Sequence, residues 1–256
     1  MSKLLLVLPV SHVDAREMLN TVKRIKFFND KLHHPILVVA TQLASKMEVL
    51  DDILLELSAL TTNISTHVLS TEYECGYPKA SNHLFISTCE YLESVGNTLP
   101  WYFFEADNIP MKENWLDIIA EEYYANGKAF MGPIVSRSER TIRTSKYKDP
   151  ILNGSSIYPP EILELIPILD GKNIPDAAWD LVISPYTRED LHVTNRIHYY
   201  WNCRKMIIKD NTLLGVSGYR DWEKHEFTID VSNDSCIFHG CKDGSLWRAI
   251  KLRQHS

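Results

Sequence analysis

The segment from Trp101 to Trp115 (WYFFEADNIPMKENW) combines an aromatic run with two closely spaced acidic residues. An apolar run without polar alternation predicts a strand buried on both faces. Side chains alternate along a strand, so Glu105 and Asp107 are expected to leave it on the same side. Carboxylates just past the carboxyl end of a central strand lie where open α/β sheets bind ligands, and they suit Mg²⁺ or Mn²⁺ carrying a phosphate. The alternative is an acidic turn that caps the next helix.

The composition is that of an ordinary globular protein. The chain has 256 residues, 45% hydrophobic and 23% charged, which suits one large or two small domains. The net charge of −6 argues against a generally basic nucleic-acid binder, although a local basic surface can still steer a ligand. The five cysteines form no CxxC pair, which favours a reducing compartment such as the cytoplasm over a disulfide framework or a zinc site.

The start of the chain alternates apolar strands with amphipathic helices. Strands are predicted at Lys3–Val10, Pro35–Ala40 and Thr66–Ser70, with a helix in each interval, the second at Gln42–Leu60. The first strand lacks the cleavage site of a signal peptide, and no stretch reaches the roughly 18 to 20 apolar residues of a membrane span. The pattern predicts a parallel sheet with helices on both faces.

Polar residues follow the first two predicted strands. Right-handed crossovers place the ends of these strands side by side, so Ser11, His12 and Thr41 either hold a nucleotide or cap helices. Lys79 begins a predicted helix at about residues 80–95, where the helix dipole prefers an anion. A cation is unfavourable at that end of a helix, and its presence is explained if Lys79 and the free backbone N–H groups face a phosphate. The alternative interpretation is that Lys79 is a solvated surface residue.

The composition becomes basic between residues 136 and 149, after a predicted helix at Trp115–Asn126 and a strand at Ala129–Val135. The segment carries Arg137, Arg140, Arg143, Lys146 and Lys148 against Glu139 and Asp149. A basic segment in an acidic protein is a candidate grip for a phosphate backbone. The alternative is a solvated charged loop.

The rest of the chain adds three polar candidates. Residues 176–183 are predicted as a helix with Asp176 at its N-cap and Asp180 on the same face. The segment 202–232 gives no clear prediction. Near the end, CIFHGCKDGSL indicates a short strand, then His239, then a glycine-flanked turn. A lone histidine is usually structural, but one between a strand and a tight charged turn is a credible ligand.

Taken together, these features resemble one family. EADNIPMKENWLD after an aromatic strand resembles the DxD-type motif of GT-A-fold glycosyltransferases, with Glu105 in place of the first Asp. GYPKASNHLF, NGSSIYPP and FHGCKDGSL surround it in the order that this family uses. The combination is most similar to the phage-type glycosyltransferases that modify hydroxymethylated pyrimidines in DNA.

The resemblance implies a GT-A-like α/β fold, with a Rossmann-type, mostly parallel sheet flanked by helices and a C-terminal extension. Residues 1–135 would form the nucleotide-sugar-binding half of one continuous domain. Residues 136–256 would form the acceptor-binding half and the segment that reaches the metal and diphosphate.

The resemblance also implies roles for individual residues. Asp107 and His239 would coordinate Mn²⁺ or Mg²⁺, and Glu105 would reach the metal through water or touch the donor ribose. Lys79 and Lys242 would face the diphosphate. Four residues would line the base pocket, namely Pro9, Val10, Ser11 and Thr41. Asp176 or Asp180 would lie near the acceptor hydroxyl.

The expected function is therefore metal-dependent transfer of a sugar from a UDP-linked donor. The expected acceptor is 5-hydroxymethylated pyrimidine in phage DNA, gripped by residues 136–149 in the host cytoplasm. One alternative is a glycosyltransferase that acts on a surface polysaccharide or other glycan. Others are a non-catalytic nucleotide-binding module and a nucleotidyltransferase, which is disfavoured because LPVSHVDAR contains no glycine. The sequence does not distinguish inversion from retention at the sugar.

Overall fold

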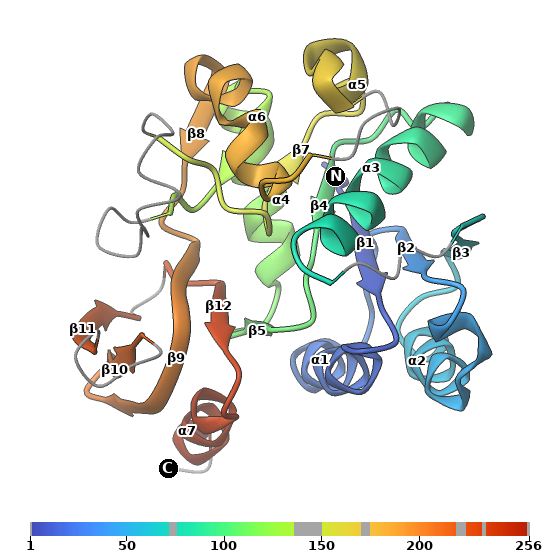
Figure 1. Cartoon of the computed structure of the whole chain (residues 1–256). Helices are drawn as coiled ribbons and strands as arrows, with labels where there is room; N and C mark the ends of the chain where they lie inside the picture. The colour runs from blue at the N-terminus through green and yellow to red at the C-terminus, as the bar shows by residue number, and fades with distance from the viewer. Residues whose placement is uncertain are drawn as a thin grey trace.

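The computed structural model describes residues 2–71, 76–135, 150–169, 175–218, 224–231 and 234–254. Within these residues, one sheet has seven strands in the order β3-β2-β1-β4-β7-β6-β8 (Figure 1). Its strands are β1 (Leu5–Val10), β2 (Ile36–Ala40), β3 (Ile64–Val68), β4 (Trp101–Phe103), β6 (Phe130–Gly132), β7 (Ile157–Tyr158) and β8 (Leu191–Val193). The first four strands in that order are parallel, as the βαβ pattern predicts.

The central strands are buried on both faces because helices cover each side of this sheet. Alternate residues of β1 and β4, among them Leu6 and Tyr102, pack with α1, α2 and α4. Their neighbours, among them Val7 and Phe103, pack with α3, α5 and α6. These helices are α1 (Ala15–Phe28), α2 (Glu48–Ser58), α3 (Lys79–Ser94), α4 (Trp115–Asn126), α5 (Ile162–Leu165) and α6 (Trp179–Thr187). The prediction that the aromatic run forms a doubly buried strand is confirmed.

A second sheet has five strands within the described residues, in the order β11-β10-β9-β12-β5. They are β5 (Asn108–Pro110), β9 (Ile197–Lys209), β10 (Thr212–Ser217), β11 (His225–Asp230) and β12 (Ile237–Cys241), and α7 (Ser245–Gln254) packs against them. Strands β9 to β11 form an antiparallel meander in the stretch that gave no clear prediction. Figure 1 shows β5 running from the first sheet to β12 in the second.

Strand β5 ties the two sheets together directly after the acidic motif. It pairs antiparallel with β12, with Phe238 opposite Ile109 and His239 opposite Asn108. This register brings a residue from near the C-terminus beside the motif at the end of β4. The two predicted halves interleave, because β5 comes from the first and completes the second sheet, while β7 and β8 come from the second and complete the first.

Several predicted boundaries differ from those in the structure. The helix predicted at Gln42–Leu60 is a 3₁₀ turn at Ala44–Lys46 followed by α2. The helix predicted to begin at an Asp176 N-cap begins instead at Trp179, with Ala178 as its N-cap, so Asp176 precedes the helix. Among the described residues, none of the helices is both long and apolar enough to cross a membrane.

Candidate metal centre and adjoining cavity

The acidic motif forms a tight turn at the end of β4. The Asn108 backbone N–H donates to the Glu105 carbonyl oxygen over 3.1 Å, and the Asn108 side-chain amide donates to the same oxygen over 3.0 Å. From α1, the Thr21 hydroxyl donates to the Ala106 carbonyl oxygen. The expectation that strand alternation aligns Glu105 and Asp107 is therefore wrong in its cause, because this turn brings the two carboxylates together.

His239 completes the cluster from the second sheet. Its Nε2 lies 3.0 Å from Asp107 Oδ1 and 3.2 Å from Glu105 Oε2. One potential ligand atom from each of the three residues lies within 4.8 Å of the others. The predicted meeting of Asp107 and His239 across more than a hundred residues of chain is thus present in the structure, and Glu105 belongs to the same cluster.

The far side of the His239 ring is held by Asn153, a buried residue between β6 and β7. Asn153 Oδ1 lies 2.9 Å from His239 Nδ1 and also accepts a hydrogen bond from the Ser155 backbone N–H over 3.0 Å. Because Oδ1 can only accept, Nδ1 carries the hydrogen of this bond. The neutral imidazole then presents its lone pair on Nε2, toward the two carboxylates, which is the form that binds a metal.

Burial and charge act in opposite directions on the cluster. Burial disfavours the ionised form of Glu105 and is the largest cause of a pKa that rises to about 7. The His239 charge opposes this rise, and the charges of Asp107 and Asp180 add to it. Burial also opposes ionisation of Asp107, but His239 and Lys242 outweigh it and hold the pKa of Asp107 below its ordinary value. Burial lowers the pKa of His239, yet Asp107 and Glu105 raise it overall. Glu105, Asp107 and His239 together form a group that could hold a metal ion.

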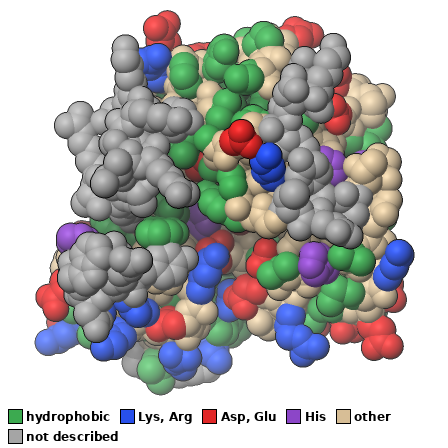
Figure 2. Space-filling model, viewed as in Figure 1, with side chains coloured by type: hydrophobic (Ala, Val, Ile, Leu, Met, Phe, Trp, Pro, Cys, Tyr) green, Lys and Arg blue, Asp and Glu red, His purple; other side chains and the backbone are tan. Residues whose placement is uncertain are grey.

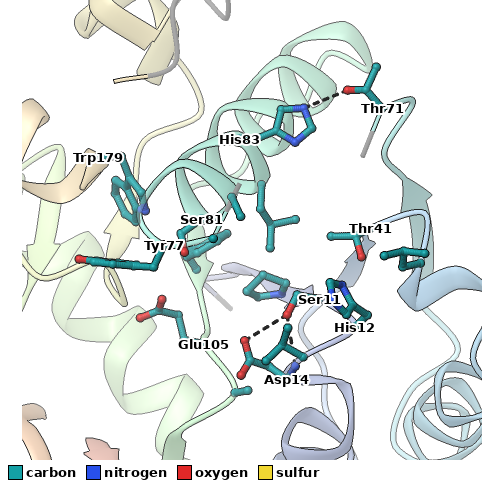
Figure 3. Close-up of a pocket in the computed structure, with 18 residues that line it drawn as sticks. Ser11, His12, Asp14, Thr41, Thr71, Tyr77, Ser81, His83, Glu105 and Trp179 are labelled. Carbon is teal, nitrogen blue, oxygen red and sulfur yellow. Dashed lines mark hydrogen bonds between the residues drawn. The ribbon is translucent and has the colours of Figure 1, made fainter. Parts of the chain in front are cut away.

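A cavity of about 540 Å³ adjoins the cluster and shares Glu105 with it. It runs from the carboxyl ends of β1 and β2 to the start of α6, as Figure 3 shows with Ser11 and Thr41 at one end and Trp179 at the other. The sequence-predicted residues Pro9, Ser11 and Thr41 line it. In the view of Figure 2, charged and histidine side chains gather near the middle of the face, where the surface is hollowed.

Other predicted site residues take different positions. Val10 is fully buried and packs in the hydrophobic core, so its side chain does not line the cavity. Lys242 Nζ lies 3.5 Å from Asp107 Oδ2, at the cluster of Glu105, Asp107 and His239. Lys79 Nζ lies 2.7 Å from Asp176 Oδ1, and the Asp176 side chain is 90% exposed. The basic segment 136–149 lies outside the described residues.

Asp180 lies deeper than Asp176, in the first turn of α6. Burial raises its pKa to about 6, against the backbone N–H of Leu181, which donates to Asp180 Oδ1 over 2.9 Å and favours the charged form. Its charge acts on Glu105 and is itself affected by His239. The two aspartates predicted to share a helix face therefore differ, because the Asp180 charge interacts with Glu105 and His239 whereas Asp176 lies at the surface.

Asp14, Thr71 and His83 line the cavity but were not identified as site residues from the sequence. The Ser11 hydroxyl donates to Asp14 Oδ2 over 3.1 Å, and the Thr71 hydroxyl lies 3.0 Å from His83 Nε2 (Figure 3). Asn153 lies in NGSSIYPP, and the sequence did not identify it as a candidate site residue. A signal was available for Asn153, because a polar NGSS run directly before apolar IYPP predicts buried polar groups that need partners.

No protein-family model matches this chain, and no curated protein matches it. Solved structures do match in fold. An active-site mutant of LgtC has a TM-score of 0.59 at 10% identity, over 98% of this chain and 94% of that one. The galactosyltransferase LgtC in complex with donor and acceptor sugar analogues has a TM-score of 0.58 at the same identity and coverage. The bifunctional glycosyltransferase WbbM has 0.53 at 10% identity, over 78% of this chain and 40% of that one. The chain has the mixed α/β fold of these glycosyltransferases, which confirms the predicted GT-A-like fold.

Proposed function

We propose that this protein is a metal-dependent glycosyltransferase that moves a sugar from a UDP-linked donor to a hydroxyl acceptor. The observation that carries the proposal is the cluster of Glu105, Asp107 and His239. It stands at the carboxyl end of a central strand, opens on a cavity of about 540 Å³, and belongs to a fold shared with glycosyltransferases. Ligands bind at this edge of open α/β sheets, which supports a nucleotide in the cavity.

The residues of the cluster fit Mn²⁺ or Mg²⁺. Two carboxylates and one imidazole offer hard oxygen donors with a single nitrogen, a set suited to these ions and not to a thiolate-bound metal. Asp107 and His239 would hold the ion, with Glu105 directly or through water. When bound, the metal neutralises negative charge that builds on a departing diphosphate.

The chain's own side chains supply the remaining chemistry. Lys242, already paired with Asp107, is proposed to contact the diphosphate. Lys79 is proposed to do the same from the N-terminus of α3, where backbone N–H groups also favour an anion. Asp180 is favoured over Asp176 as the residue near the acceptor hydroxyl. Its charge interacts with those of Glu105 and His239, and a carboxylate in that position can accept the hydroxyl proton as a general base.

The acceptor has two candidates. The sequence resemblance and the basic segment 136–149 support a 5-hydroxymethylated pyrimidine in phage DNA. The fold likeness to a galactosyltransferase solved with an acceptor sugar analogue supports a sugar hydroxyl. The two are separated by transfer of labelled sugar to duplex DNA with hydroxymethylated bases or to free mono- and disaccharides. If DNA is the acceptor, replacing Arg137, Arg140 and Arg143 should weaken binding and reduce its salt dependence.

The central test is donor hydrolysis with and without Mn²⁺. A specific nucleotide sugar should raise the melting temperature of the wild type in the presence of Mn²⁺, because ligand binding stabilises the fold by mass action. Asp107→Ala should abolish metal-dependent turnover, whereas Asp52→Ala, which removes an exposed carboxylate on α2, should not. Unchanged turnover in Asp107→Ala would exclude the proposed metal role.

A further inference from the structure

Three side chains spaced three residues apart on α3 contact the segment that leads into α6. Lys79 pairs with Asp176 at the start of the segment. Two helical turns later, the Phe85 ring stacks on the Trp179 indole, with ring centroids 3.5 Å apart and planes 9° apart. Asn82 lies between them on the same helix face. This stripe belongs to GYPKASNHLF, in which only Lys79 was singled out from the sequence.

Asn82 makes the most specific of these contacts. Its side chain is fully buried, and its amide nitrogen donates to the carbonyl oxygens of Pro175 over 2.8 Å and Ala177 over 2.7 Å. Its Oδ1 accepts a hydrogen bond from the Trp179 backbone N–H over 2.8 Å. Residues 175–178 have no regular secondary structure, so their backbone groups need partners from elsewhere. One buried side chain supplies three such hydrogen bonds.

The segment that Asn82 holds enters the candidate site. Trp179 lines the same cavity as Glu105 (Figure 3). The next residue, Asp180, is half-buried, and its charge interacts with those of Glu105 and His239. A shift of the backbone at Trp179 would therefore move both the cavity wall and the proposed acceptor-side carboxylate.

We propose that Asn82 is a positioning residue, which fixes the backbone at 175–179 so that Trp179 and Asp180 keep their places in the site. The inference rests on the proposed function only in the part that Asp180 plays in transfer. Asn82 itself is not among the residues of the candidate metal cluster or of the described cavity lining, and it contacts the lining only through the Trp179 backbone. If the role of Asn82 were purely structural, its hydrogen bonds would attach the start of α6 to α3 without any effect on transfer through Asp180. The experiment must separate this structural role from the positioning role.

The first measurement requires no catalysis. Hydrogen–deuterium exchange at the Trp179 amide is compared in wild type, Asn82→Leu and Thr88→Val. Thr88 is a fully buried residue of α3 whose hydroxyl donates only within the helix, to Leu84 O over 2.7 Å, so it controls for general weakening of α3. Asn82→Leu should exchange at this amide about tenfold faster or more, and Thr88→Val should not. Wild-type protection in Asn82→Leu would overturn the proposal.

The second measurement is a double-mutant cycle on metal-dependent donor turnover and transfer. Asn82→Leu should lower kcat by roughly tenfold to a hundredfold, because small misplacement of a catalytic group costs this much. In the Asp180→Ala background the same change should lower kcat by less than about twofold, since the positioned carboxylate is already absent. Equal losses in both backgrounds would show that Asn82 does not act through Asp180.

A second variant covers failure of Asn82→Leu to fold. Asn82→Asp keeps an acceptor for the Trp179 amide and loses both donors, so it should show the same dependence on Asp180 with a smaller loss of kcat. If the wild type itself shows no metal-dependent turnover, the proposed function fails, while the exchange measurement still tests whether Asn82 holds the segment. The two failures are therefore distinguishable.

Discussion

Asn153→Leu tests whether the metal centre depends on a fixed histidine orientation. In the wild type, Asn153 Oδ1 accepts from His239 Nδ1 over 2.9 Å and from the Ser155 N–H over 3.0 Å. Leucine leaves both donors without this acceptor in a buried site. Each unsatisfied buried group costs about 1–3 kcal/mol, so the free energy of unfolding should fall by about 2–6 kcal/mol. This loss concerns the protein without metal.

The metal affinity should fall as well. Loss of a hydrogen-bond partner behind a metal-binding histidine typically costs 10- to 100-fold in affinity, which is about 1.4–2.7 kcal/mol. At a Mn²⁺ concentration about 100 times the wild-type Kd, metal binding stabilises the wild type by about 2.7 kcal/mol. By the same relation, a 10-fold weaker site gains about 1.4 kcal/mol, and a 100-fold weaker site gains about 0.4 kcal/mol.

The assay is denaturant unfolding with and without Mn²⁺, together with calorimetric titration of Mn²⁺. Comparing the stabilisation by metal within each variant separates the loss of affinity from the loss of stability. Asn153→Asp is the matched control, because its carboxylate still accepts both hydrogen bonds and should preserve Mn²⁺ affinity. If Asn153→Leu binds Mn²⁺ within about twofold of the wild type, the argument that Asn153 orients His239 is refuted.

Three further predictions concern Gly240, Asp180 and His34. Gly240→Ala should destabilise the fold by about 2 kcal/mol or more and impair Mn²⁺ binding, because Gly240 has a φ of +105° and a Cβ there would lie 2.0 Å from the Tyr200 carbonyl oxygen. The control is Gly127→Ala, since Gly127 has a φ of +70° and open space around it. In a melting experiment this control should lose only the stability that the strained backbone costs. Asp180→Asn should lower kcat by about tenfold or more with a smaller change in Mn²⁺ affinity, since Asp180 acts on Glu105 through its charge, and a larger loss of affinity than of kcat would place Asp180 in the metal centre instead. Burial is the main cause of a lowered pKa at His34, so the unfolded chain binds a proton at His34 more readily than the folded protein does. The contribution of His34 to the free energy of unfolding is therefore present above about pH 6.5 and is lost as the pH falls through the folded-state pKa. The loss is at most about 1.4 kcal/mol per pH unit. Urea unfolding from pH 7.5 to 5 should show this extra slope in the wild type and in exposed His33→Gln but not in His34→Gln.

The parallel half of the fold was predictable because its signals are local. The run Trp101 to Phe104 is apolar at every position and rich in aromatic residues, which favours a strand with both faces covered. The helix at Trp115–Asn126 was predicted with the observed bounds, and Gly127 follows it as the C-cap in the left-handed conformation that ends many helices. The start of the helix at 176–183 was misplaced because aspartate is a common N-cap residue, whereas the Asp176 side chain pairs with Lys79 on another helix.

The site was only partly predictable, because its parts depend on contacts between distant segments. The sequence identified Glu105, Asp107 and His239 as chemically suitable, but nothing in their spacing shows that they meet. Their meeting depends on the register of β5 with β12, which places His239 opposite Asn108, one residue after Asp107. A shift of one residue would turn the His239 side chain to the other face of the sheet, toward the core that holds Phe238.

Three sets of contacts fix that register, which explains how a strand of three residues can position the candidate site. The Asn108 amide bonds close the acidic turn, Asn153 holds the opposite side of the His239 ring, and Gly240 packs against the Tyr200 carbonyl of β9. None of these residues carries charge or offers a nucleophile, so a search for chemically active side chains passes over them. Because the proposed metal ligands come from two sheets, these uncharged contacts determine whether the ligands converge, and substitutions at them should affect Mn²⁺ binding before they affect any step of the reaction.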